Sequence, residues 1–71
     1  MTKETKFIIF CIESYKVYKS LTGKQTFNLF NDYGVINYLT EFYDILHSTG
    51  HQYIVRDIDE YLKARGAVIP C

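Results

Sequence analysis

The sequence has no long apolar run, and this excludes a membrane-spanning helix. Its longest apolar stretch, from Phe7 to Ile12, holds six residues and ends at Glu13, whereas a helix needs about 20 apolar residues to cross a bilayer. The same stretch lacks the ordered charged, apolar and small-residue regions of a secretory signal peptide. We therefore expect a cytoplasmic protein with no membrane association.

Cysteine, glycine and proline are scarce, with two, four and one in a chain of 71 residues. Cys11 and Cys71 cannot build a disulfide framework, and Cys11 stands in an apolar helical segment, which is typical of a small buried side chain. The glycines are isolated, so no glycine-rich phosphate-binding loop is present. The glycine-flanked motif of a catalytic nucleophile is absent around Ser14, Ser20 and Ser48. We predict no enzyme activity, no catalytic residue, no small-molecule substrate and no cofactor.

Net charge is also absent, since eight basic residues balance eight acidic ones. The total therefore does not indicate nucleic-acid or anionic membrane binding. The two halves differ, because residues 1–24 carry an excess of three positive charges and residues 25–71 an excess of three negative charges. Such asymmetry is compatible with self-association or with an oppositely charged protein partner, and also with solvated lysines on a helix face.

What the sequence does have is helical periodicity with clear boundaries. Residues 5–20 repeat apolar side chains at helical spacing. Thr22 and Gln25 then form a capping-box pattern, which predicts a second helix over 23–32. Gly34 suits the left-handed position that ends a helix.

Residues 35–48 are apolar around much of a helix circumference, which predicts a third, central helix. Residues 51–56 include strand-like side chains with no second strand to pair with, so we expect an extended lead-in. Asp57, with Glu60 three residues later, predicts the start of a fourth helix over 57–65. The predicted fold is all-α, a compact bundle of four helices in one domain (1–66) with a C-terminal tail (67–71).

Two groups of residues resemble metal or acid–base sites, and both have a structural interpretation. His47 and His51 are four residues apart, but Gly50 lies between them and no cysteine or pair of carboxylates is near in sequence to complete a ligand set. Asp57, Asp59 and Glu60 all fall in the first turn of the predicted last helix, where negative charge is favourable. We therefore predict no metal site.

Aromatic residues are unusually frequent, at 17% of the chain. Tyrosine has an apolar ring and a polar tip, so it suits both the edge of a core and a protein interface. Seven tyrosines cannot all be buried in so small a domain. They are either half-buried residues at the rim of a small core or part of an interface. Under the second interpretation, a partner or a second copy in a homodimer meets six of them: Tyr15, Tyr18, Tyr38, Tyr43, Tyr53 and Tyr61.

A DNA-binding function is the alternative. The short helix over 23–32, the turn at Gly34 and the following helix have the layout of a helix-turn-helix motif in a dimeric transcriptional regulator. However, residues 35–46 contain Glu41 and Asp44 but no lysine or arginine, and attraction to phosphate dominates DNA affinity. Nucleic-acid binding is therefore disfavoured.

Several segments resemble a family of short bacterial proteins of unknown function: Leu21–Lys24, Phe30–Ile36, Tyr38–Leu39, Tyr43–His47 and Gln52–Leu62. The likeness covers about residues 6–66, and the family is common in clostridial and Bacteroides-type anaerobes. Its genes often lie beside one for a protein that resembles ADP-ribosyltransferases. The resemblance implies a non-catalytic protein–protein interaction module, an antitoxin-like or accessory partner of a toxin.

Overall fold

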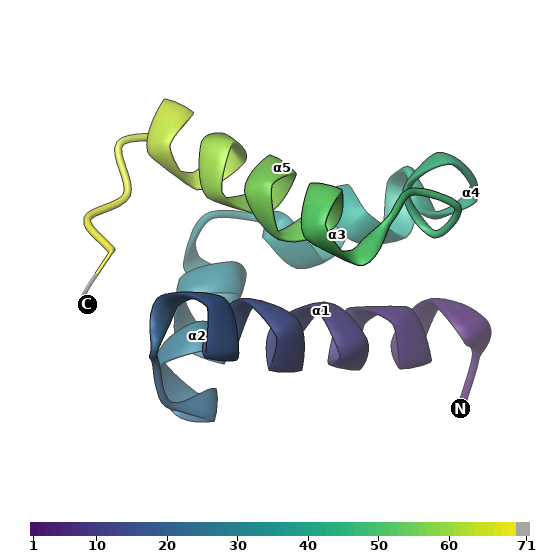
Figure 1. Ribbon diagram of the computed structural model, residues 1–71, viewed down its shortest axis with the longest axis horizontal. Coiled ribbons are helices and arrows are strands. Elements are labelled where there is room, and N and C mark those ends of the chain that lie inside the picture. The colour runs from purple at the N-terminus through teal and green to yellow at the C-terminus, as the bar shows by residue number, and fades with distance from the viewer. Residues whose placement is uncertain (70–71) are drawn as a thin grey trace.

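The computed structural model describes residues 1–69, except for the side chain of His51. The part described is all-helical and contains no strand, as predicted, but it has five helices rather than four. Figure 1 shows their arrangement, with α1 below α5 and α2 packed against one end of α1. The helices are α1 (Lys3–Lys19), α2 (Gly23–Asp32), α3 (Val35–Glu41), α4 (Tyr43–Leu46) and α5 (His51–Ala64).

Local signals set the bounds of α1 and α2 within two residues of the prediction. The Thr2 hydroxyl accepts a hydrogen bond from the Thr5 backbone N–H and begins α1. Ser20 ends it in the left-handed conformation, with φ 57°. The predicted capping box is confirmed, because the Gln25 N–H donates to Thr22 Oγ1 while the Thr22 N–H donates to Gln25 Oε1.

Residues 35–48 do not form the single helix that was predicted. The helix breaks at Phe42, where φ is −104° and ψ is 22°. Two aromatic contacts lie on either side of the break: the Phe42 ring packs against Tyr38, and the Tyr43 ring meets Phe7 of α1 edge-on at 5.4 Å. The break thus lets consecutive aromatic residues contact different elements. Gly34, by contrast, takes the predicted left-handed conformation, with φ 73°.

The extended lead-in over 51–56 was also predicted wrongly, since α5 begins at His51. Gly50 precedes it in an extended conformation. Ile54 and Val55 lie on the same helical stripe as Ile58 and Leu62, and all four are buried. Burial of this stripe outweighs the strand propensity of the branched residues. The predicted cap at Asp57 is therefore wrong as well, because Asp57 lies in the middle of α5.

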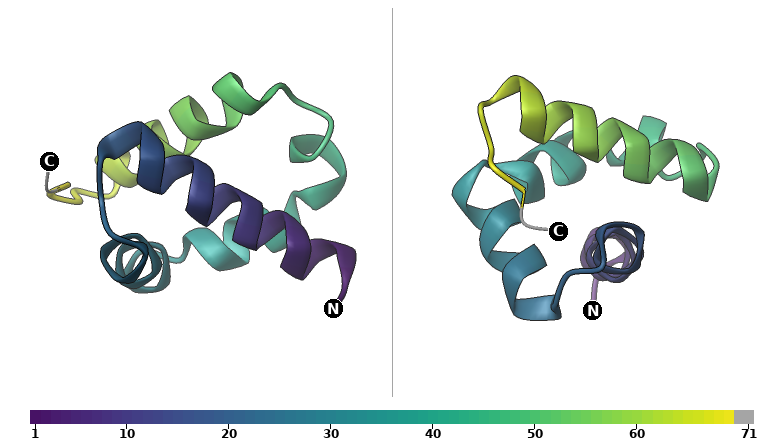
Figure 2. Two further views of the ribbon diagram at one scale, coloured as in Figure 1. Left: turned by 60° about the horizontal axis from the view of Figure 1, so that its bottom comes forward. Right: turned by 60° about the vertical axis from the view of Figure 1, so that its left-hand side comes forward.

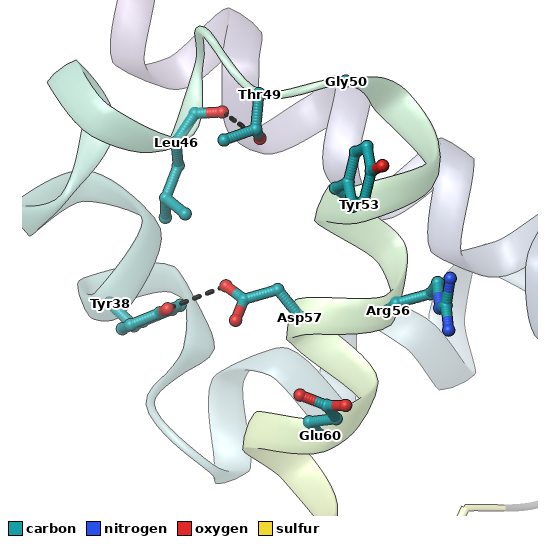
Figure 3. Close-up of a pocket in the computed structure, with 8 residues that line it drawn as sticks. All are labelled: Tyr38, Leu46, Thr49, Gly50, Tyr53, Arg56, Asp57 and Glu60. Carbon is teal, nitrogen blue, oxygen red and sulfur yellow. Dashed lines mark hydrogen bonds between the residues drawn. The ribbon is translucent and has the colours of Figure 1, made fainter.

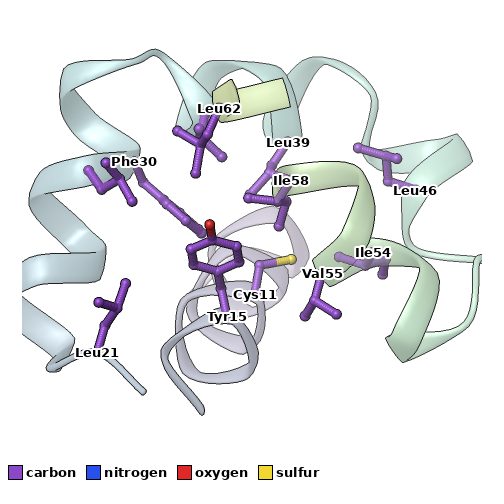
Figure 4. Close-up of a cluster of buried hydrophobic side chains, with 12 residues drawn as sticks. Cys11, Tyr15, Leu21, Phe30, Leu39, Leu46, Ile54, Val55, Ile58 and Leu62 are labelled. Carbon is purple, nitrogen blue, oxygen red and sulfur yellow. The ribbon is translucent and has the colours of Figure 1, made fainter. Parts of the chain in front are cut away.

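The hydrophobic core lies where α1, α2, α3 and α5 meet (Figure 4). In the right-hand view of Figure 2, α1 is seen nearly end-on while α5 runs across the picture, so these helices cross steeply. Cys11 and Tyr15 of α1, Phe30 of α2 and Leu39 of α3 are fully buried in this core. Burying side chains of this size contributes about 1.5–3 kcal/mol each. The crossing leaves the outer face of α1 uncovered.

The segment after α5 returns to the core. The Ala67 N–H donates to the Leu62 carbonyl, and Ala67 and Ile69 pack against buried side chains. Pro70 and Cys71, the end of the predicted tail, lie outside the described residues. Within residues 1–69, no helix combines the length and apolarity needed to cross a membrane.

Candidate functional site

The tyrosines that we expected at a partner surface do not form one patch. Tyr15 has no exposed surface, so it is a core residue and cannot meet a partner in this structure. Tyr38, Tyr43 and Tyr61 are half-buried. Tyr18 and Tyr53 are 48% and 71% exposed, and they lie beside different hollows. The composition therefore indicated surface aromatics correctly, but the packing distributes them around α5.

Asp59 fastens α5 to α1. Its carboxylate is nearly buried and accepts a hydrogen bond from the Tyr15 hydroxyl at 2.8 Å. It also forms ion pairs with Lys63 at 3.0 Å and Lys19 at 3.3 Å. Burial raises the pKa of Asp59, but the hydrogen bonds from Lys63, Tyr15 and Lys19 outweigh it and lower the pKa below its ordinary value. Asp59 therefore forms a charged tertiary contact between α5 and α1.

Asp57 links α5 to α3, on the side of α5 away from α1. The Tyr38 hydroxyl donates to Asp57 Oδ2 at 2.8 Å, and the Tyr38 ring stacks on Tyr61 with centroids 4.3 Å apart. Arg65 lies over the Tyr61 ring at 4.1 Å and donates to its hydroxyl at 2.7 Å. Burial and the bond to Asp57 raise the pKa of Tyr38 to about 12, so its hydroxyl stays a donor at neutral pH.

A pocket of about 690 Å³ opens beside Tyr38, between the end of α4 and the outer flank of α5 (Figure 3). Such a volume is in the range of ligand-binding clefts. Asp57 points into it toward Tyr38, whereas the guanidinium of Arg56 points away. The full lining is Tyr38, Leu46, Thr49, Gly50, Tyr53, Arg56, Asp57 and Glu60.

A second hollow, a groove of about 440 Å³, runs between α1 and the opposite flank of α5. Its walls are largely apolar, because Phe10, Val17 and Tyr18 of α1 face Val55 of α5. Phe10 is 44% exposed and Val17 is 75% exposed. The remaining lining residues are Glu13, Ser14 and Gln52.

Tyr43 lies apart from both hollows. Its ring meets Phe7, stacks on the His47 imidazole at 4.4 Å and lies under the Lys3 ammonium group at 5.6 Å. The His47 Nδ1 atom lies 2.7 Å from the Tyr43 carbonyl oxygen. These contacts join the start of α1 to α4. The position of His47 is therefore accounted for by packing.

Comparison with protein families matches residues 6–65 to the model described as "Protein of unknown function (DUF3791)". The chain belongs to this family. Comparisons with curated proteins and with solved structures find no significant match. Membership of the DUF3791 family assigns no activity, so any function must be argued from the two hollows and their residues.

The remaining candidates for chemistry in residues 1–69 of this DUF3791 chain are metal-ligating and nucleophilic side chains. Within that part, excluding the His51 side chain, no three His, Cys, Asp or Glu residues come together as a possible metal site. Burial raises the pKa of Cys11 to about 12, so its thiol is a poor nucleophile at neutral pH. No buried side-chain nitrogen or oxygen among the described residues lacks a hydrogen-bond partner.

Sequence reasoning missed the groove because the apolar repeat over residues 5–20 indicated a buried stripe and did not single out Phe10 or Val17. The first helix is apolar almost all round, and a helix of that kind is normally covered on every side. Phe10 and Val17 are seven residues apart, hence on one face, and that spacing was the available signal. Which face stays uncovered depends on how α2, α3 and α5 pack, and this was not visible in the sequence.

Proposed function

We propose that this protein is a non-catalytic protein–protein interaction module that receives an apolar helical segment of a partner in the α1–α5 groove. The observation that carries the proposal is the exposed row of Phe10, Val17 and Tyr18 beside Val55. A groove between two helices suits an amphipathic helix, which lays its apolar face into it.

The charges at the groove support a helical partner with a mixed polar edge. Glu13 and Gln52 stand among the apolar lining residues, and Glu13 forms an ion pair with Lys16 at 2.8 Å. The groove lining therefore combines apolar side chains with a few polar groups, as specific protein interfaces do. Aromatic side chains such as Phe10 and Tyr18 are frequent among residues that dominate binding energy.

The finer proposal is an antitoxin-like or accessory role toward an ADP-ribosyltransferase-like toxin encoded nearby. Its support is the family resemblance described from the sequence, together with a groove that carries no catalytic group. An accessory protein of this kind needs a binding surface rather than an active site, and the α1–α5 groove would supply it.

Co-expression with the neighbouring gene product, followed by pull-down and size-exclusion chromatography, tests the proposal. We expect a complex with the wild type and relief of toxicity. Val17→Glu places a charge on the exposed groove face and should weaken binding at least about tenfold. Ile45→Glu is the matched control, because Ile45 is 66% exposed and lies on α4, away from the groove.

The outcomes distinguish the proposed binding groove from the proposed antitoxin-like role. Absence of a complex with wild-type protein refutes the antitoxin-like role. A complex that Val17→Glu leaves intact refutes the groove as the binding surface. Light scattering of the protein alone measures self-association. If the wild type is a dimer, and Val17→Glu disrupts this dimer while Ile45→Glu does not, the partner in the groove is a second copy of this chain.

No observation favours the DNA-binding alternative enough to propose it. The α2–turn–α3 layout exists, but α3 has no basic side chain to meet phosphate.

A further inference from the structure

We propose that the pocket beside Tyr38 binds an arginine side chain presented by a polypeptide ligand. The pocket lies on the flank of α5 that faces α3 and α4, whereas the groove lies on the flank that faces α1. The inference is therefore independent of the proposed function, and each can fail without the other.

The charge of the pocket favours a cation. Asp57 and Glu60 both line it, and neither forms an ion pair with another described residue. Lys63, three residues beyond Glu60, forms its ion pair with Asp59, and Asp59 raises the pKa of Lys63 more than Glu60 does. Tyr38 occupies only one oxygen of Asp57, namely Oδ2. Arg56 is the single positive residue of the lining, and its guanidinium points away from the pocket in Figure 3.

The rest of the lining suits the apolar stem of a long cationic side chain. Leu46 and the ring of Tyr38 form one wall, and Tyr53 stands opposite them on α5 (Figure 3). Arginine side chains place their methylene groups on apolar surface while the charged end stays at the rim. The volume of about 690 Å³ accommodates such a side chain with the adjoining backbone.

A guanidinium fits this pocket better than an ammonium group. It is planar, stacks on aromatic rings and can bond a carboxylate through two N–H groups at once. Tyr53 supplies an exposed ring, and Asp57 and Glu60 supply the carboxylates. The Tyr61 ring, which stacks on Tyr38 next to the pocket, already lies under the guanidinium of the protein's own Arg65 at 4.1 Å.

The test titrates the ¹⁵N-labelled protein with acetyl-Gly-Arg-Gly-amide and follows backbone amide shifts by NMR. We expect saturable shifts at Thr49, Gly50 and Tyr53. The citrulline peptide, which replaces the guanidinium by a neutral group of the same shape, should cause none. Free arginine should bind more weakly, because its own carboxylate meets Asp57 and Glu60.

Two variants give the direction of each charge effect, and a third is the control. Glu60→Gln alters an exposed side chain that forms no ion pair with another described residue, and it should weaken binding about fivefold, the order of one partly exposed ion pair. Arg56→Gln should strengthen binding about twofold by removing a like charge. Asp32→Asn is the matched control, an exposed acid on α2, and should change nothing.

The proposal is overturned if the citrulline peptide produces the same shifts, if the shifts map to the α1–α5 groove, or if Glu60→Gln binds as tightly as wild type. Because Glu60→Gln leaves the core untouched, misfolding cannot account for its result.

Discussion

Replacing Asp59 with asparagine should destabilise the protein by about 2 kcal/mol. Asparagine can still accept the Tyr15 hydroxyl, so the change removes charge rather than the hydrogen bond. A charge-assisted hydrogen bond stabilises the fold by about 1 kcal/mol more than a neutral one. The partly buried ion pair with Lys19 contributes up to about 1 kcal/mol more to stability. The Lys63 ion pair adds little, because that side chain is 62% exposed.

Asp59→Ala should cost more, about 3–4 kcal/mol, because it also leaves the Tyr15 hydroxyl buried without this acceptor. That loss approaches the whole stability of a small domain, which is about 5 kcal/mol. Urea unfolding followed by far-ultraviolet circular dichroism measures both changes. The control is Asp32→Asn, which removes an exposed acid and should cost less than about 0.5 kcal/mol.

The asparagine variant should also lose the acid dependence that Asp59 confers. The pKa of Asp59 is lower in the folded protein than its ordinary value of 3.8. The carboxylate therefore stabilises the fold above pH 3.8, and this contribution disappears as the pH falls through the folded pKa. The difference between wild type and Asp59→Asn should shrink on acidification. Equal urea midpoints at neutral pH, or a difference unchanged well below pH 3.8, would refute the reasoning.

Further predictions concern the backbone and the core. Ser20→Gly should stabilise the protein by about 0.5–1 kcal/mol, since φ at Ser20 is 57° and glycine adopts it freely. Gly34→Ala should cost about 1 kcal/mol at φ 73°, although the added methyl group meets no atom within 4 Å; thermal unfolding checks both, and shifts of the opposite sign would contradict them. Thr22→Ala should cost about 1 kcal/mol by removing half of the capping box, as urea unfolding would show, and an unchanged midpoint would disprove that role. Cys11 should react with a thiol reagent only on unfolding, because burial raises its pKa to about 12; rapid labelling of the native protein at Cys11, located by peptide mapping to distinguish it from Cys71, would count against its burial.

Much of the helical architecture could be predicted from the sequence, because the signals that begin and end helices act over a few residues. The capping box joins Thr22 and Gln25, and the bonds form between groups three residues apart. Gly34 adopts a left-handed conformation that costs glycine little. Neither feature needs the rest of the chain, so both were predicted correctly.

The start of α5 and the role of its aspartates required the tertiary structure. Asp57 and Asp59 resemble helix-capping residues in the sequence, but their partners are Tyr38, 19 residues away, and Tyr15, 44 residues away. Ile54 and Val55 have strand propensity, and only packing against the core makes them helical. Local patterns carry no information about such distant partners.

Which aromatic side chains are exposed, and beside which hollow they lie, also depends on the tertiary structure. The sequence was sufficient to indicate a small all-helical domain rich in aromatic residues with no recognisable catalytic motif. It could not indicate that Tyr15 is buried, that Tyr18 lies beside the groove, or that Tyr53 lies beside the pocket. Helical periodicity specifies which residues share a face, whereas the crossing of α1 and α5 specifies which of those faces are covered.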